Sequence, residues 1–215
     1  MAVVAIIQQK GGVGKSTITA NVAAELVAKG RTVQVFDLDP QQSLVAWASL
    51  GEGTLKDIVE PLDTDDPRKF KAAIDKANTW ADRILLDCPP GLPDTGLMAA
   101  LVADLALLPV TPSPLDVMAS KKAIDLMREA QKQRKDRKPT IALVPSRVAQ
   151  NTVLGRDLRD SIKPLGELIL PGISTRIAIA EAVLQGLTLR EYAPSNDGVE
   201  EFRLLTNAIE KMVKA

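Results

Sequence analysis

The sequence predicts an α/β fold in which a doubly wound, mostly parallel sheet is flanked by helices. Short aliphatic runs alternate along the 215-residue chain with longer stretches of helical character. These runs are continuously apolar, as strands are when helices cover both faces of a sheet. A glycine-rich segment separates the first run from the first helical stretch. Because ligands of such folds bind beyond the carboxyl ends of the strands, the residues directly after each run are candidate site residues.

Each expected element follows from its own residue pattern. Runs rich in Val, Ile and Leu predict a weaker strand at Leu168–Pro171 and five stronger ones at Val3–Ile7, Thr32–Phe36, Arg83–Asp87, Leu105–Val110 and Thr140–Pro145. Helices are expected between the runs, at 15–29, 41–50, 67–78, 94–103, 114–134, 153–162, 177–185 and 199–214. Gly30 follows the first of these at the position where helices commonly end.

Length and charge limit the class of protein. A chain of 215 residues without a low-complexity segment is expected to form one domain, 1–215, with a substantial core. Its 27 Lys and Arg balance its 27 Asp and Glu, so attraction to nucleic acid requires a local basic patch. No apolar run approaches the roughly 20 residues that span a bilayer, and residues 1–7 lack the basic start of a secretory signal. A cytoplasmic protein is therefore expected.

The composition also limits the chemistry. The single cysteine, Cys88, excludes a disulfide within the chain and a four-thiolate cluster. The chain has no histidine, which excludes imidazole as a base or a metal ligand. Chemistry must rest on carboxylates, lysines, hydroxyls, backbone amides or a bound cation.

The segment "QQKGGVGKST", Gln8–Thr17, lies between the first expected strand and the first expected helix, the context that a phosphate-binding loop requires. Glycines let backbone N–H groups face a phosphate, and the helix N-terminus adds its positive dipole end. We expect Lys15 to contact the β- and γ-phosphates and Ser16 to ligate Mg²⁺. A glycine-rich turn before an ordinary helix is the alternative. The candidate nucleotide-binding residues here are Lys10, Gly11, Gly12, Val13, Gly14, Lys15, Ser16 and Thr17.

Two expected strands end in carboxylates. Asp37 and Asp39 follow the second run in "FDLDPQ", and Asp87 ends the third in "ILLDCPPG". Carboxylates beside a phosphate loop suit Mg²⁺ and the water molecules that it retains, so the candidate metal residues are Ser16, Asp37 and Asp87. We expect Asp87 to bind Mg²⁺ through water and Gly91 to sense the γ-phosphate. An Asp-rich turn that caps the next helix is the alternative for Asp37 and Asp39.

The pattern K-G-G-V-G-K-S, with its additional lysine at position 10, resembles the deviant Walker A motif of the ParA/MinD superfamily of ATPases. The resemblance implies that Lys10 reaches across a dimer interface to the phosphates of the ATP in the other subunit, where a cation stabilises the charge of phosphoryl transfer. It also implies that Asp39 orients the attacking water. The catalytic residues would be Lys10, Lys15 and Asp39, with ATP and Mg²⁺ as cofactors. A solvated loop charge is the alternative for Lys10.

The segment "PVTPSPLD", Pro109–Asp116, is similar to one in the short, ParF-like partition branch of this superfamily, where it lies near the adenine and the dimer interface. This implies nucleotide contacts for Pro112, and for Arg147 after a later strand. Members of the family form ATP-bound homodimers that bind nucleoid DNA without sequence preference. A ParB-like or other adaptor stimulates hydrolysis and releases them. The cargo, whether plasmid, chromosome or another assembly, is not encoded in a readable motif.

DNA contacts in this family involve basic residues of the C-terminal part, which bind phosphates and do not read bases. The resemblance therefore implies DNA contacts for Arg156, Arg159, Lys163 and Arg176. Aromatic residues make up 3% of the chain, which argues against base stacking.

Two other classes of function stay open. A MinD-like membrane-cycling ATPase would end in a basic amphipathic anchor, whereas the stretch 199–214 mixes Glu with Lys and is expected to pack on the core, so no membrane partner is expected. A dethiobiotin-synthetase-like ligase would phosphorylate a small acid without an equivalent of Lys10. Iron–sulfur relatives require cluster cysteines that this chain lacks. The sequence therefore favours a cytoplasmic, nucleoid-associated partition or positioning ATPase.

Overall fold

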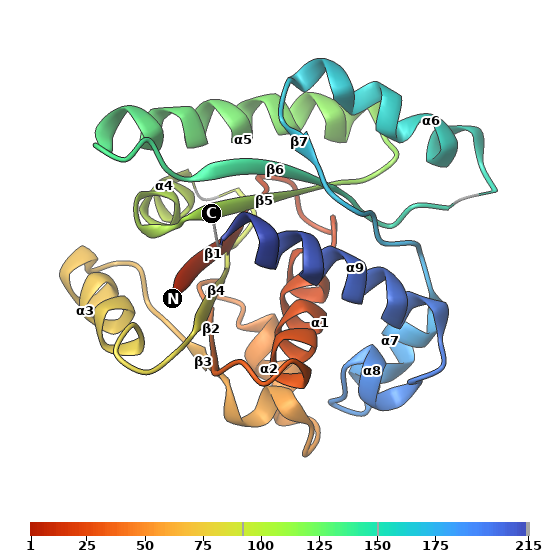
Figure 1. Cartoon of the computed structure of the whole chain (residues 1–215), viewed down its shortest axis with the longest axis horizontal. Helices are drawn as coiled ribbons and strands as arrows, with labels where there is room; N and C mark the ends of the chain where they lie inside the picture. Colours follow the sequence, from red (N-terminus) through yellow and green to blue (C-terminus); the bar gives the residue numbers. More distant parts are fainter. Residues whose placement is uncertain (92, 150, 214–215) are drawn as a thin grey trace.

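A parallel sheet forms the centre of the protein (Figure 1). The computed structural model describes residues 1–91, 93–149 and 151–213. Within these residues the sheet has seven strands in the order β3-β2-β4-β1-β5-β6-β7, and all neighbouring strands are parallel. The strands are β1 (Ala2–Ile6), β2 (Val33–Asp37), β3 (Val59–Pro61), β4 (Arg83–Asp87), β5 (Leu105–Val110), β6 (Thr140–Pro145) and β7 (Leu168–Ile169).

The sheet confirms the predicted fold class, and it adds one strand that the sequence analysis missed. β4, β5 and β6 have the predicted bounds, whereas β1 and β2 are each displaced by one residue and β7 is shorter. The additional strand is β3, which has three partly or fully exposed residues, one of them a proline. So short a segment, interrupted by Glu60, shows no apolar run, and its pairing with β2 depends on its neighbours in the fold.

Helices cover both faces of the sheet, as the continuously apolar strands predict. Val3 and Ala5 of β1 join a core with α3, α4, α5 and α6 on one face, whereas Val4 and Ile6 join a core with α1, α2, α8 and α9 on the other. The helices are α1 (Lys15–Ala28), α2 (Ser43–Ser49), α3 (Pro67–Ala77), α4 (Pro93–Val102), α5 (Pro114–Gln133), α6 (Val153–Ile162), α7 (Ile177–Leu184), α8 (Leu189–Tyr192) and α9 (Asp197–Met212). Two short 3₁₀ helices, η1 (Thr54–Asp57) and η2 (Lys163–Leu165), complete the description.

The eight predicted helices are present with ends within two residues, apart from the predicted end at Lys214, which lies outside the described residues. The sequence analysis missed α8. This four-residue helix is held by a capping box in which Thr188 and Glu191 exchange hydrogen bonds with each other's backbone, and Glu191 also accepts from Thr54.

The last helix packs on the core, as predicted. Phe202, Leu205 and Ile209 of α9 are buried in the core that α9 shares with α1. On the adjoining face Glu210 accepts hydrogen bonds from Arg83 at 2.5 Å and from Arg31 at 2.9 Å. In the part of the chain that the structure describes, we find no helix that combines the length and the apolar character of a bilayer span.

The register of three strands brings the predicted acidic residues together. Asp87 of β4 lies beside Asp37 of β2 on one side and beside Ile6 of β1 on the other. Because the strands are parallel, the loops that follow them leave from the same edge of the sheet. The candidate site is built at that edge.

Candidate nucleotide-binding and hydrolysis site

The phosphate-binding loop joins β1 to α1. Gly12 and Gly14 have left-handed backbone conformations, with φ of 74° and 93°. A Cβ atom at Gly14 would lie 2.8 Å from the Ser146 hydroxyl oxygen, so the loop also needs glycine there for space. Gly14 provides no side-chain cap for α1, and the first turn of α1 contains no acidic residue. The N-terminus of α1 therefore suits an anion.

Residues that follow two other strands, β6 and β4, hold this loop in place. Ser146 Oγ donates to the Val13 carbonyl oxygen at 2.7 Å, and Arg147 Nη1 donates to the Gly12 carbonyl oxygen at 2.7 Å. The Gly91 N–H donates to the Gln9 carbonyl oxygen at 2.9 Å. In each of these contacts a carbonyl oxygen of the loop accepts the hydrogen bond. Because the N–H and C=O groups of a trans peptide point in opposite directions, the N–H groups of these peptides face away from the donors. These contacts orient the N–H groups of the loop toward an anion. The Gly91 N–H can donate to a phosphate only after its hydrogen bond to the Gln9 carbonyl oxygen breaks.

A cavity of about 490 Å³ lies in front of the loop, a size that suits a nucleotide. Among the residues that line it are predicted ones: Gly11, Gly12, Gly14, Lys15, Ser16, Thr17, Asp39 and Arg147. The facing wall includes residues that the sequence analysis did not assign to the nucleotide: Thr175, Ile179 and Val183. Val13 is buried beneath the loop. Pro112 lines a separate hollow between α5 and α6, and its contact with a nucleotide stays a prediction.

Lys15 provides a cation inside this cavity. The residue is 7% exposed, and its Nζ donates to the Lys10 carbonyl oxygen at 3.3 Å. Burial lowers the pKa of Lys15, whereas the nearby Asp87 raises it. A buried ammonium group held by one long hydrogen bond gains strong partners when a phosphate enters. The geometry thus agrees with the phosphate contact expected of Lys15.

Asp87 lies beneath the loop at the end of β4. Its Oδ1 accepts a hydrogen bond from the Thr19 hydroxyl at 3.0 Å. Burial raises the pKa of Asp87 from 3.8 to about 7, while hydrogen bonds from Ser16 and Thr19 act in the opposite direction. The oxygen donors of Ser16 and Asp87 fit Mg²⁺, which would neutralise phosphate charge when bound. The described residues contain no cluster of three or more His, Cys, Asp or Glu that could hold a metal ion.

Asp37 caps the helix that follows it, as the alternative in the sequence analysis has it. Its Oδ1 accepts from the Asp39 N–H at 3.0 Å, and its Oδ2 accepts from the N–H groups of Leu44 at 2.9 Å and Val45 at 3.1 Å. Because Leu44 and Val45 lie in the first turn of α2, Asp37 supplies the cap that this helix otherwise lacks. The carboxylate thus fixes the loop that carries Asp39, and a role of Asp37 at Mg²⁺ stays a prediction.

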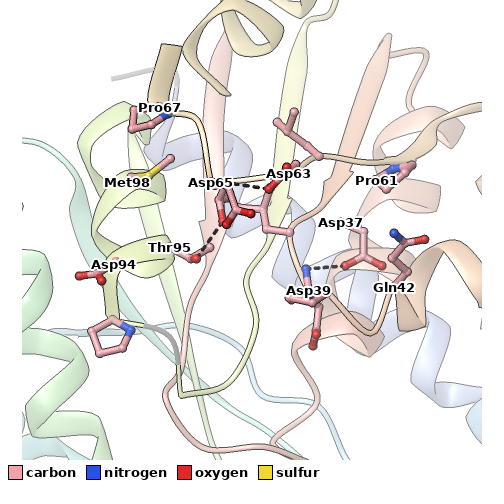
Figure 2. Close-up of a pocket in the computed structure, with 15 residues that line it drawn as sticks. Asp37, Asp39, Gln42, Pro61, Asp63, Asp65, Pro67, Asp94, Thr95 and Met98 are labelled. Carbon is pink, nitrogen blue, oxygen red and sulfur yellow. Dashed lines mark hydrogen bonds between the residues drawn. The ribbon is translucent and has the colours of Figure 1, made fainter. Parts of the chain in front are cut away.

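Asp39 lies between two cavities. It lines the nucleotide cavity and also a larger one of about 940 Å³, whose other acidic residues include Asp37, Asp63, Asp65 and Asp94 (Figure 2). Its Oδ1 accepts from the Gln41 N–H at 2.9 Å. This half-buried position at the rim of the nucleotide cavity is compatible with the orientation of an attacking water, which stays a prediction.

Lys10 pairs with an acidic residue in the first turn of α5. Its side chain is 44% exposed, and its Nζ forms an ion pair with Asp116, whose side chain is 5% exposed. Asp116 lies in the first turn of α5 and also accepts a hydrogen bond from the Thr111 hydroxyl. The sequence analysis includes Asp116 in the segment Pro109–Asp116 but assigns it no role. The signal in the sequence that could have indicated such a role is an acidic residue at the end of a segment expected to lie near the site.

The four predicted DNA-binding residues separate into two groups. Arg156 and Arg159 of α6 and Lys163 of η2 are exposed and spaced as one helical face. Arg176 instead lines the nucleotide cavity, where its Nη2 lies 2.7 Å from Oε1 of Glu201 on α9. The chain after β7 returns to the phosphate loop and carries Arg176 with it. Arg176 thus lies apart from the other three residues, and DNA binding by any of the four stays a prediction.

We expect Asp87 to make the nucleotide-free protein less stable as the pH rises. Its pKa is 3.8 in an ordinary setting and about 7 in the folded chain, so the folded state binds more protons between these values. The free energy of unfolding should therefore fall from about pH 4 to about pH 7, by a few kcal/mol in all. Urea unfolding at pH 5 and pH 8 measures this, and Asp87→Asn should lose the effect. Asp57→Asn, an exposed control, should behave as the wild type; parallel curves for wild type and Asp87→Asn would contradict the assignment.

Three features define a phosphate-loop nucleotide-binding protein. They are a glycine-rich loop before α1, the buried Lys15 at the end of that loop, and the buried Asp87 beneath the loop. The family described as CobQ/CobB/MinD/ParA nucleotide binding domain matches residues 4–189. The chain belongs to this family and is an ATPase.

Similar proteins agree with this assignment. Maintenance of carboxysome distribution protein A from Halothiobacillus neapolitanus is 31% identical over 212 residues, which are 95% of this chain and 94% of that protein. The chromosome-partitioning ATPase Soj from Thermus thermophilus is 26% identical over 238 residues, covering 96% and 94%. The septum site-determining protein MinD from Pyrococcus horikoshii, solved in complex with Mg-ADP, shares the fold with a TM-score of 0.77 and 23% identity, covering 100% of this chain and 98% of that one.

Proposed function

We propose that this chain is a ParA-type partition or positioning ATPase. It forms a dimer with ATP between the subunits, binds nucleoid DNA as a dimer, and leaves the DNA when a ParB-like or other adaptor stimulates hydrolysis. The arrangement of the two lysines supports the proposal most strongly: Lys15 is buried and lines the nucleotide cavity, while the half-exposed side chain of Lys10 contacts Asp116 instead. One chain therefore has a cation for its own nucleotide and a second one near its surface.

The proposed cargo is an intracellular assembly of the kind for which the similar proteins are named. One similar protein is named for carboxysome distribution and another for chromosome partitioning. Both align over nearly the whole chain, so the alignments do not favour one type of cargo over the other. The proposal therefore concerns positioning in general, with the adaptor selecting the cargo.

The residues divide the reaction between binding and hydrolysis. The loop N–H groups and Lys15 bind the phosphates, Ser16 and Asp87 hold Mg²⁺, and Asp39 orients the attacking water. Asp37 fixes Asp39 through the backbone contact at 3.0 Å. Lys10 of the second subunit then stabilises the transferred phosphoryl group. Hydrolysis is slow in a lone subunit because its site lacks this cation.

Turnover per chain as a function of protein concentration tests the proposal. We expect turnover to rise with concentration, DNA and adaptor, and ADP and phosphate to be the products. Analytical ultracentrifugation with a slowly hydrolysed ATP analogue should show dimers that ADP does not support. A constant turnover per chain with a monomeric ATP complex would reject the dimer, and a phosphorylated small acid among the products would indicate a ligase.

The basic face of α6 provides a separate prediction for DNA binding. Arg156→Gln should weaken ATP-dependent binding equally for unrelated duplexes, and it should reduce the slope of log affinity against log salt by about 0.9 if the side chain contacts one phosphate. Fluorescence anisotropy at several salt concentrations measures both quantities. Arg203→Gln on α9 is a matched control, because Arg203 is also exposed and basic. An unchanged slope for Arg156→Gln would remove this residue from the DNA interface.

A further inference from the structure

We propose that Trp47 is a positioning residue for ATP hydrolysis: by binding the α7–α8 turn (residues 185–188), it holds α2 and the adjoining Asp39 loop (residues 38–42) in place. This inference rests on the proposed function, because it concerns the residue that is to orient the attacking water. Its basis is a hydrogen bond from Trp47 Nε1 to the Leu187 carbonyl oxygen at 3.1 Å. The two residues are 140 positions apart, so the bond joins segments that only the fold brings together.

The indole ring of Trp47 is buried in the core that α2 shares with α1, α8 and α9. The residue is 5% exposed, and a buried N–H group without an acceptor would destabilise the fold. The Leu187 carbonyl oxygen is that acceptor. The other buried side chains of α2, those of Leu44 and Ala48, are aliphatic and carry no hydrogen-bonding group. Trp47 therefore gives this short helix a directional contact with the turn.

The α7–α8 turn lies directly against the end of α2. A Cβ atom on Gly186 would lie 2.1 Å from the Gly51 nitrogen, and one on Gly51 would lie 2.3 Å from the Gln185 carbonyl oxygen. Neither position can carry a side chain unless the two segments move apart. The backbone of the turn and the backbone after α2 are thus in contact, and the bond from Trp47 to Leu187 crosses the same boundary.

The turn is in turn anchored to α1, the helix that begins at the phosphate loop. α8, which follows the turn, lies beside α1 (Figure 1). The Leu189 N–H donates to Asn21 Oδ1 at 2.9 Å, and Arg190 donates to the two carboxylate oxygens of Glu25 at 2.7 and 2.9 Å. The position of α2 is therefore tied, through the turn, to the helix that carries the phosphate loop.

A second contact ties the chain after α2 to α8. Glu191 Oε1 accepts from the Thr54 N–H at 2.7 Å and from the Thr54 hydroxyl at 2.6 Å. Its Oε2 accepts from the N–H and the hydroxyl of Thr188, both at 2.8 Å. Since Thr54 begins η1, the segment from α2 to η1 is held at two points, one at Trp47 and one at Thr54.

From α2 the constraint passes to Asp39 through the backbone. Asp37 accepts from N–H groups of the first turn of α2 and from the Asp39 N–H, and the Gln42 N–H donates to the Asp39 carbonyl oxygen at 2.8 Å. The start of α2 and the Asp39 loop therefore move as one unit. A displacement of about 1 Å is enough to impair a catalytic group. Loss of the bond from Trp47 to Leu187 should thus affect hydrolysis more than ATP binding.

Trp47→Phe tests the inference, because it keeps an aromatic ring in the core and removes the N–H donor. We expect kcat for adaptor-stimulated hydrolysis to fall about 10-fold, since Asp39 is displaced but not removed, while ATP affinity and the dimer dissociation constant stay within about two-fold. Trp80→Phe, at the other tryptophan, is the matched control and should change none of these quantities, because Trp80 is 51% exposed. A kcat within about two-fold of the wild type, or an equal loss of ATP affinity, would overturn the inference.

Two further measurements separate positioning from a general loss of stability. Phe202→Leu on α9 alters the same core, and it should lower the free energy of unfolding without lowering kcat. In a Trp80→Phe background, a tryptophan analogue with sulfur in place of the indole N–H can be placed at position 47 alone. This analogue keeps the ring size and removes the donor, so it replaces Trp47→Phe if that variant does not fold, and kcat should fall about 10-fold. An unchanged kcat with the analogue, or an equal fall in Phe202→Leu, would also overturn the inference.

Asp39→Ala keeps the inference apart from the proposed function. If Asp39→Ala hydrolyses ATP as fast as the wild type, the water-orienting role fails, and the role of Trp47 fails with it. If Asp39→Ala is inactive and Trp47→Phe keeps the wild-type kcat, the role of Trp47 fails alone. In an Asp39→Ala background, Trp47→Phe should cause no further loss of kcat, because the side chain that it positions is absent. A further loss there would show that Trp47 does not act through Asp39.

Discussion

Lys10→Ala is expected to lower adaptor-stimulated turnover by about 10³-fold while ATP affinity stays within a few-fold of the wild type. The first effect follows from the loss of a cation that acts in trans on the transferred phosphoryl group, a contribution of the size seen for arginine fingers. The second follows from the structure, because Lys10 Nζ contacts Asp116 and not the nucleotide cavity. Phosphate release measures turnover, and the fluorescence of a labelled nucleotide measures affinity.

The control for this prediction is a lysine with no role in the site. Lys29, the exposed residue directly after α1, suits this purpose, and Lys29→Ala should change neither quantity. Because Lys10→Ala also leaves the buried Asp116 without its cation, the free energy of unfolding has to be measured alongside. An equal loss of ATP affinity in Lys10→Ala and Lys15→Ala would contradict separate roles for the two lysines.

Lys15→Ala is expected to lower ATP affinity by about 10²-fold. A buried ammonium group that makes two charge-assisted hydrogen bonds of about 1.5 kcal/mol each contributes roughly this factor. The residue is 7% exposed, so water cannot easily replace the lost charge. Titration of labelled ATP at low protein concentration, where dimers do not form, measures the affinity of the single chain. A change of less than about three-fold would place the phosphate contact elsewhere.

Mixing the two variants tests the crossing of Lys10 directly. Lys10→Ala retains the lysine that binds its own ATP, and Lys15→Ala retains the lysine that crosses to the other subunit. A mixed dimer therefore contains one complete site, although each variant alone contains none. We expect turnover to recover when the two inactive proteins are combined at high concentration. Continued inactivity, with mixed dimers demonstrated by differential labelling, would show that Lys10 does not act across the interface.

Much of the fold was predictable because its patterns are local. The strands β4, β5 and β6 are continuously buried runs, so their bounds follow from the sequence alone. The short β3 and α8 were missed for the opposite reason: neither has an apolar pattern, and each depends on contacts with segments distant in sequence, such as the bond from Thr54 to Glu191. Element bounds at such places depend on the neighbours that the fold supplies.

For the candidate site, the sequence by itself determined the phosphate loop, Lys15 and the acid at the end of β4, because glycine spacing and strand ends are properties of contiguous residues. Only the tertiary structure decided that Asp37 caps α2, that Arg176 faces the nucleotide cavity and that Lys10 is bound to Asp116. Lys10 and Asp116 are 106 positions apart, and no local pattern relates them. Their contact exists because β1 and β5 are neighbouring parallel strands, which place the loop and the start of α5 at the same edge of the sheet.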